Sequence, residues 1–196
     1  MKFNFNRFGK YFIFKTSYNQ QAMKSFLLAI SLIGILSSCQ DKDSDPDAKT
    51  LPQATQTGAD TGGALVNGKI WVSKIEKSTV AALGNNTTYA FVNNEYSLKI
   101  HLRNAENPSG NTIQLLLVSG QDFAVGDYPL NENDHGLYYD SSKIYATDHE
   151  NIGTLSITKF DKASKIISGT FSFKAKYYYD GETVTVTEGR FDRKYQ

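Results

Sequence analysis

The chain has 196 residues, of which 21 are basic and 20 acidic, and its single cysteine leaves no partner for a disulfide within the chain. Residues 1–38 hold five of the basic residues and no acidic one, so residues 39–196 carry 16 basic against 20 acidic side chains. This mildly acidic portion repels phosphate backbones, which argues against nucleic-acid binding.

An export signal is predicted at residues 23–38. Its basic start at Met23 and Lys24 is followed by 11 mostly apolar residues, 26–36. As a helix this segment spans about 16 Å, roughly half the hydrocarbon thickness of a bilayer, which is typical of a signal peptide and too short for a membrane span. Because the signal is complete from Met23 onward, residues 1–22 are predicted to be a misassigned N-terminal extension.

The export signal ends in a lipidation motif. Leu36, Ser37 and Ser38 precede Cys39, which matches the lipobox pattern of an aliphatic residue, two small residues and a cysteine. The sequence therefore predicts cleavage before Cys39 and a lipid on its thiol, which anchors the mature protein to a membrane. Residues 39–61 are predicted to form a flexible linker, because they are polar, with four Asp among the eight residues after the cysteine.

The residues after Cys39 also bear on location. An acidic run directly behind the lipidated cysteine resembles the export tag that sends lipoproteins to the cell surface in one Gram-negative phylum known for glycan uptake. Gln40 rather than Asp follows the cysteine, so the inner-membrane retention signal of enteric bacteria is not matched. We therefore expect an outer-membrane lipoprotein, and the sequence leaves open whether it faces the periplasm or the cell exterior.

Residues 62–196 are predicted to form one all-β domain. At 96–102 apolar and polar side chains alternate, so one face is buried and the other is in water, which is typical of antiparallel sheets. Asn67-Gly68 between two apolar runs predicts a tight hairpin turn. About nine or ten strands are expected, in a β-sandwich or a small β-barrel, between which the sequence does not decide. The predicted strands are 64–66, 69–72, 87–92, 96–102, 112–118, 143–147, 153–159, 168–178, 183–187 and 190–195.

Four local features are expected from the same pattern. Residues 115–118 are continuously apolar and are expected to be covered on both faces. Residues 131–136 are expected to form a turn. Gly189 is expected to relieve backbone crowding between the last two strands, and Trp71 to fill the core.

Two pairs of motifs resemble a known family. The sequence LPQATQTG at 51–58 is followed by LVNGKIW at 65–71, and GTFSF at 169–173 is followed by TEGRFD at 187–192. These residues are similar to those of a family of small uncharacterised bacterial outer-membrane lipoproteins, which is classed as a domain of unknown function. The resemblance implies a lipoprotein with an all-β domain, and it carries no catalytic residues across.

Candidate metal ligands occur beside one predicted hairpin. Asp134, His135 and His149 flank it, and histidines with carboxylates can bind Zn²⁺. No HExxH spacing is present, so no metal site is expected, and a metal-dependent hydrolase using these three residues ranks last among the functions considered. No GxSxG motif and no glycine-rich phosphate loop followed by a helix is present either. The chain is therefore expected not to be an enzyme and to need no cofactor.

Tyrosines provide the remaining candidate surface. In a run such as 177–179, strand alternation places at least one ring away from the core, and exposed tyrosines can stack on sugar rings and bond to their hydroxyls. From the seven tyrosines between positions 128 and 179, we select Tyr138, Tyr139 and Tyr178 as a possible binding surface. The preferred function is a lipid-anchored domain that binds a glycan or a protein partner without catalysis. The alternative is a small barrel that carries an apolar ligand inside.

Overall fold

A computed structural model describes residues 50–74, 87–104, 110–140 and 142–196. The predicted export signal, Cys39 and the acidic run lie outside these residues. Within the described ranges the chain is all-β, as the sequence predicts, and these ranges contain no helix with the length and apolar character needed to span a bilayer.

Eleven strands form in the described residues, and they pair antiparallel throughout. They are β1 (Thr61–Val66), β2 (Lys69–Val72), β3 (Thr88–Val92), β4 (Glu95–Arg103), β5 (Thr112–Ser119), β6 (Gly126–Leu130), β7 (His135–Asp140), β8 (Lys143–Ala146), β9 (Gly153–Asp161), β10 (Ile166–Tyr177) and β11 (Thr183–Lys194).

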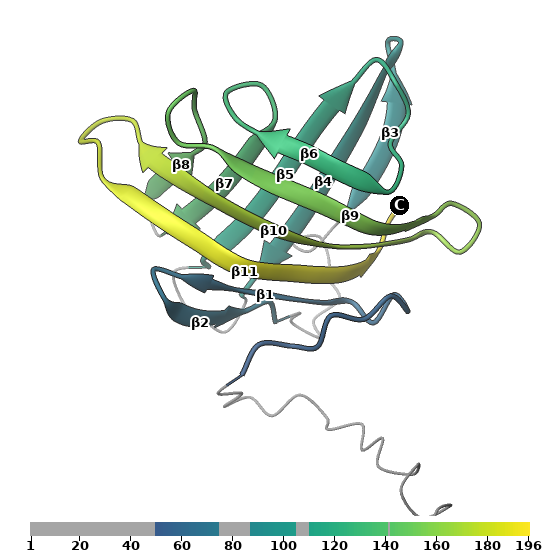
Figure 1. Cartoon of the computed structure of the whole chain (residues 1–196), viewed down its shortest axis with the longest axis horizontal. Coiled ribbons are helices and arrows are strands. Elements are labelled where there is room, and N and C mark those ends of the chain that lie inside the picture. Colours follow the sequence, from purple (N-terminus) through teal and green to yellow (C-terminus); the bar gives the residue numbers. More distant parts are fainter. Residues whose placement is uncertain (1–49, 75–86, 105–109, 141) are drawn as a thin grey trace, which may run out of the picture. The chain divides into compact units, whose positions relative to one another are not determined.

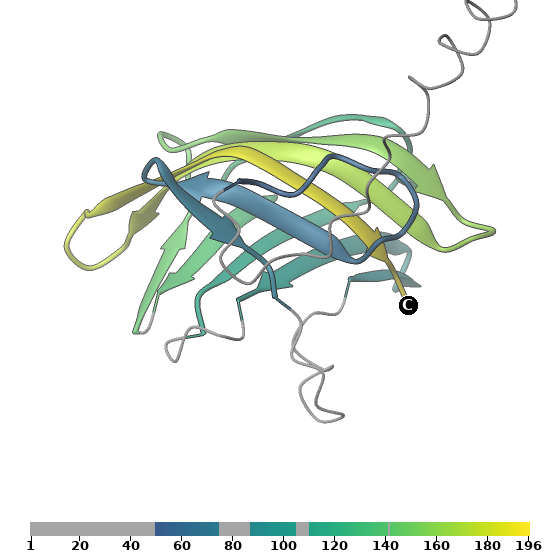
Figure 2. The same ribbon diagram turned by 90° about the horizontal axis from the view of Figure 1, so that it is seen from below.

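The strands form one continuous sheet that folds into two layers (Figure 1 and Figure 2). The first layer follows the order β2-β1-β11-β10-β9-β6, and the second follows β3-β4-β5-β7-β8. Strand β10 joins the layers, because Lys176 and Tyr177 at its end pair with Ala146 and Tyr145 of β8. The sheet is not closed into a barrel, so of the two architectures that the sequence leaves open, the structure has the β-sandwich.

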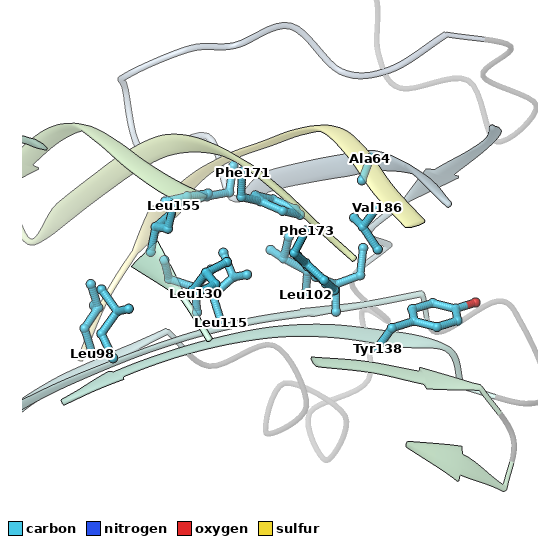
Figure 3. Close-up of a cluster of buried hydrophobic side chains, with 14 of the residues drawn as sticks. Ala64, Leu98, Leu102, Leu115, Leu130, Tyr138, Leu155, Phe171, Phe173 and Val186 are labelled. Carbon is cyan, nitrogen blue, oxygen red and sulfur yellow. The ribbon is translucent and has the colours of Figure 1, made fainter. Parts of the chain in front are cut away.

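The core lies between the two layers. In β4, the alternate residues Leu98, Ile100 and Leu102 are fully buried, as the sequence pattern predicts. Figure 3 shows Leu98 on the second layer, on the opposite side of the cluster from Leu155 and Phe171 of the first. Burying each Leu or Ile side chain is worth about 1.5–3 kcal/mol, so such rows provide much of the energy that offsets the cost of ordering the chain.

Strand β5 departs from the expectation that residues 115–118 are covered on both faces. Leu115 and Leu117 are buried, whereas Val118 is 43% exposed, so that expectation is wrong. A two-layer sandwich gives each strand one face toward the core, and an apolar residue at an outward position stays in contact with water.

The sequence pattern misses β6 and β7. Strand β6 contains Gly126, Asp127 and Pro129, which are residue types depleted in strands. It tolerates the proline because it lies at the edge of the sheet and pairs only with β9. The turn expected at 131–136 is shorter than predicted, because His135 already begins β7.

Strand β11 is one strand where the sequence predicts two. Its buried positions change from even-numbered, at Val184 and Val186, to odd-numbered at Phe191, and its pairing with both neighbours shifts at the same place. Glu188 has a positive φ of 50°, which marks a β-bulge. A Cβ at Gly189 would lie 2.4 Å from the ring of Phe171 in β10, so this glycine relieves crowding inside β11.

Two of the motifs that carry the family resemblance, LPQATQTG and TEGRFD, meet at one buried carboxylate, Asp192 of β11. It accepts hydrogen bonds from the backbone N–H groups of residues 57–59 and from the hydroxyls of Thr55 and Ser168, at distances from 2.7 to 3.1 Å. Burial alone would raise the pKa of Asp192, but these hydrogen bonds outweigh burial and hold the pKa well below its usual range.

The contacts of Asp192 fix residues 55–59 to the domain, although the sequence assigns them to a flexible linker. We call residues 55–59 the strap. Gly58 lies in the strap with a φ of 74°, a conformation that glycine adopts without steric cost. Strand β1 begins at Thr61, close to the predicted start of the domain at residue 62. The hydrogen bonds between residues 55–59 and Asp192 therefore attach the chain to the domain before its first strand begins.

Candidate functional site

A cleft of about 290 Å³, here called the end cleft, lies at one end of the sandwich. The turn between β1 and β2, the strand β8 and the turn between β10 and β11 lie together at this end, on the left of Figure 1 and Figure 2. The side chains that give the cleft its chemistry are Trp71, Asn111, Tyr138, Asp140, Tyr145 and Glu182.

Three buried aromatic side chains line the end cleft. Trp71 belongs to the edge strand β2, where alternation turns it inward next to the exposed Ile70. Tyr138 lies opposite Tyr145 across the β7–β8 hairpin, with 6.0 Å between the ring centroids. In Figure 3, Tyr138 stands at the margin of the core cluster and its hydroxyl points away from the other labelled side chains. The three rings therefore belong to the core cluster, and the Tyr138 hydroxyl lies at its margin.

Two buried polar atoms at the end cleft lack a hydrogen-bond partner within the described part of the chain. They are Nε1 of Trp71, a donor, and Oδ1 of Asn111, an acceptor. The Asn111 amide is held by its other end, because Nδ2 donates to the Tyr138 hydroxyl at 2.9 Å. An unpaired buried polar group costs about 1–3 kcal/mol, and proteins pair nearly all of them.

Carboxylates give the end cleft an acidic character. Asp140 and Glu182 line it together with one cationic side chain, Lys69. Burial raises the pKa of Tyr138, and the charge of Asp140 raises it further. Burial likewise raises the pKa of Tyr145, with an added contribution from Glu182. Both phenols therefore remain protonated at neutral pH.

An unbroken series of ring contacts leads from the end cleft to the surface. The ring of Tyr145 lies 5.9 Å from that of Tyr177, which lies 5.4 Å from Tyr179, which in turn lies 5.5 Å from Tyr178. These separations are typical of favourable aromatic pairs. Tyr178 and Tyr179 are 87% and 82% exposed. We call these four residues together with Tyr138 the tyrosine row.

Lys143 of β8 fixes the hairpin that carries the outer tyrosines. Its Nζ contacts the carboxylate of Glu182, lies 3.1 Å from that of Asp180, and stands 5.0 Å from the centroid of the Tyr177 ring. The hydrogen bonds to Glu182 and Asp180 raise the pKa of Lys143 above its ordinary value. Because this lysine and its partners are partly exposed, they contribute little stability, and their effect is to position the turn.

A family model described as a domain of unknown function, DUF6252, matches residues 63–193. The chain belongs to this family. The match runs from β1 to β11 and so includes most of the end cleft's elements as well as Asp192. The expected resemblance to an uncharacterised domain family is thereby confirmed, whereas its lipoprotein character stays a prediction. Comparisons with curated proteins and with solved structures gave no match.

The structure separates the three tyrosines that the sequence selects for this DUF6252 domain. Tyr138 is only 6% exposed and lines the end cleft, whereas Tyr178 stands on the exposed hairpin. Tyr139 projects from the opposite face of β7, where its hydroxyl donates to Gln114 at 3.4 Å, because neighbouring residues of a strand point to opposite faces. Tyr138 and Tyr178 are connected through the tyrosine row, and Tyr139 is not part of it.

Other residues of the site are not selected as candidates from the sequence. Trp71 is assigned to the core alone, and Asn111 belongs to none of the motifs. Tyr145, Tyr177 and Tyr179 are among the seven tyrosines considered but are not selected. The register of the β7–β8 hairpin is the signal that could have found Tyr145, because it places this residue opposite Tyr138.

The candidate metal ligands do not come together. Within the described ranges, no group of three or more His, Cys, Asp or Glu side chains could hold a metal ion. Asp134 accepts a hydrogen bond from the backbone N–H of Val118 at 2.8 Å, and the His149 side chain is 75% exposed beside Glu150. His101 alternates with the buried Ile100 and Leu102 in β4, and its pKa is lowered to about 4 by burial and by nearby cationic residues, so it is neutral at pH 7.

A second hollow, of about 460 Å³, lies on the first layer and is lined by residues of β9, β10 and β11. Its wall includes Thr154, Ser156 and Thr170. None of the buried unpaired polar atoms found in the described residues belongs to this hollow. The end cleft is therefore the stronger candidate for a ligand site.

Proposed function

We propose that the protein is a lipid-anchored outer-membrane lipoprotein whose β domain binds a glycan or a protein partner without catalysis, through the tyrosine row. The observation that carries the binding role is the series of five tyrosine rings in contact, of which two are more than 80% exposed. Solvated aromatic rings of this kind are enriched where proteins contact partners, because they combine apolar area with a polar tip.

The anchoring role is supported by the sequence, since Cys39 stands in a lipobox behind an apolar segment too short to cross a bilayer. About 15 residues separate Cys39 from the strap bound to Asp192. As a polar coil they would reach roughly 20 Å on average, enough to lift the domain off the lipid headgroups.

Anchoring is tested with a Cys39→Ala variant expressed in the native host. The wild-type chain is expected to take up radiolabelled palmitate and to fractionate with the outer membrane, whereas the variant is expected to do neither. A variant that stays in the membrane fraction would contradict the lipid anchor. Protease shaving of intact cells then decides between the periplasmic face and the cell surface.

Binding is tested with the mature chain carrying Cys39→Ala, which removes the lipid. A glycan array is compared for this protein, for the same chain with Tyr178→Ala and Tyr179→Ala, and for a Tyr139→Ala control on the other face of β7. We expect the double substitution to remove binding and the control to retain it. Equal binding by all three proteins would contradict a role for the tyrosine row.

The two alternatives have less support. A carrier of an apolar ligand needs open space inside the domain, and side chains that are fully buried occupy the space between the layers (Figure 3). A metal-dependent hydrolase needs Asp134, His135 and His149 to converge, and the described residues contain no such group.

A further inference from the structure

The unpaired atoms of the end cleft specify the kind of group that would complete it. Trp71 Nε1–H needs an acceptor and Asn111 Oδ1 needs a donor; both atoms are buried, and both residues line the same cleft. A hydroxyl group accepts and donates at once, so a single hydroxyl placed between the two atoms would satisfy both requirements. A carboxylate or a phosphate oxygen would leave the Asn111 oxygen facing another acceptor.

The surrounding side chains indicate which class of molecule would carry this hydroxyl group. The aromatic rings of Trp71, Tyr138 and Tyr145 offer apolar faces and edges, and the carboxylates of Asp140 and Glu182 accept hydrogen bonds from further hydroxyls. A ring with apolar C–H groups and several hydroxyls matches both features. Lys143 offsets the charge of Glu182, but an anionic version of such a ring would still face two acceptors, the Asp140 carboxylate and the Asn111 oxygen, which disfavour it.

We propose that the end cleft binds an uncharged saccharide unit, one hydroxyl of which accepts a hydrogen bond from Trp71 and donates one to Asn111. This inference rests on the proposed binding function and names the ligand class of its inner site. The exposed end of the tyrosine row then provides room for further units of the same glycan. A cleft of about 290 Å³ is at the lower limit of ligand sites, which suits one sugar unit, with a Kd on the order of 1 mM.

The test uses the single tryptophan of the chain, whose indole N–H gives one resolved NMR signal. The mature chain with Cys39→Ala, labelled with ¹⁵N, is titrated with four neutral probes: maltotriose, cellotriose, mannotriose and N-acetylchitotriose. Trigalacturonic acid is the charged comparison. We expect at least one neutral probe to shift the indole signal saturably, and the acidic probe to bind at least tenfold more weakly.

Two variants separate hydrogen bonding from packing. Trp71→Phe removes the donor and keeps an aromatic ring, and we expect it to weaken binding of the active probe about tenfold in ligand-observed NMR. Asn111→Leu removes the acceptor at similar volume, together with the hydrogen bond that Nδ2 donates to Tyr138, and is expected to weaken binding at least as much. Tyr139→Phe removes a phenol hydroxyl on the opposite face of β7 and is the matched control. Far-UV circular dichroism confirms that each variant is folded.

The outcomes distinguish the inference from the proposed function. An indole signal that no neutral probe moves overturns the saccharide site, even if array binding through Tyr178 and Tyr179 persists and upholds the proposed function. If no probe moves the indole signal and the array also shows no binding, then both the saccharide site and glycan binding by the tyrosine row are overturned. Equal binding of neutral and acidic probes overturns the uncharged class. Unchanged affinity in folded Trp71→Phe and Asn111→Leu overturns the assigned hydrogen bonds.

Discussion

Both ends of the sandwich gather tyrosines, but they differ in how their polar groups are paired. At the end opposite the cleft, here called the closed end, the ring of Tyr89 contacts those of Phe160 and Tyr195 at 5.2 and 5.7 Å. The Tyr89 hydroxyl donates to Asp122 at 2.6 Å, and Lys162 contacts the same carboxylate while lying 5.5 Å from the Tyr89 ring centroid. The aromatic, anionic and cationic groups around Tyr89 are therefore paired with one another, although the Oγ1 atom of the neighbouring Thr87 is buried without a hydrogen-bond partner in the described residues.

The end cleft contains similar residue types, but not all of their polar groups have hydrogen-bond partners. Its rings are also packed, yet Trp71 and Asn111 each keep a buried polar atom without a partner in the described residues, and Tyr178 and Tyr179 stand in solvent. The difference teaches that aromatic content alone does not identify a binding site. The feature that distinguishes the candidate ligand site is an unpaired donor and an unpaired acceptor on residues that line one cleft.

The largest expected effect comes from Asp192, which ties the strap to the domain near the closed end. Asp192→Asn replaces one acceptor oxygen by an NH₂ group that faces hydrogen-bond donors. We expect a loss of about 3 kcal/mol in the free energy of unfolding, measured by urea denaturation of the mature chain at pH 7. Asp180→Asn, at an exposed carboxylate of the β10–β11 turn, is the control and should leave the free energy of unfolding nearly unchanged. A loss below about 1 kcal/mol in Asp192→Asn would show that the carboxylate does not hold the strap.

The same carboxylate predicts how stability depends on pH. Because the folded-state pKa of Asp192 lies below the unfolded value of about 3.9, its contribution is complete above roughly pH 4 and is lost progressively as the pH falls further. Urea midpoints measured from pH 6 down to pH 2.5 should therefore fall more steeply in the wild-type protein than in Asp192→Asn. Parallel curves for the two proteins would be inconsistent with the lowered pKa.

A smaller effect is expected for the hydroxyl at the closed end. Tyr89→Phe keeps the three-ring cluster and removes the hydrogen bond to Asp122, which should cost about 1 kcal/mol. Tyr139→Phe removes a long, weak hydrogen bond to Gln114 and should change stability by about 0.3 kcal/mol or less. Thermal unfolding by circular dichroism compares the two variants. Equal losses would contradict the structural role assigned to the closed end.

The smallest effect on stability is expected at the exposed tyrosines. Because Tyr178 and Tyr179 are mostly in solvent, replacing both by Ala should change the free energy of unfolding by no more than about 0.5 kcal/mol. The urea midpoint of the double variant is the measurement. A large loss would mean that these rings support the fold, and the comparison between a structural end and a binding end would then fail.

Local chemistry explains which parts of the fold the sequence predicts. The Asn67-Gly68 turn and the alternation in β4 follow from positive φ angles and from two-residue periodicity, which neighbouring residues determine. Strand β6 and the continuity of β11 depend on long-range pairing. An edge position tolerates Pro129, and the bulge at Gly189 reverses the alternation that would otherwise reveal a single strand.

The candidate site is predictable only in part for the same reason. The wealth of tyrosine is visible in the sequence, and Tyr178 is correctly expected to be exposed. Trp71 of β2 and Asn111 before β5 line the same cleft because the sheet folds into two layers, and no local sequence pattern predicts this. The unpaired atoms become visible only once every neighbouring donor and acceptor has been placed.

A crystal structure of the mature chain soaked with the neutral trisaccharide that gives the largest NMR shift tests the central claim most directly. The account predicts a sugar ring in the end cleft, with one hydroxyl within hydrogen-bond distance of both Trp71 Nε1 and Asn111 Oδ1. A sugar bound elsewhere, or a cleft in which an ordered water alone joins these two atoms, would contradict it.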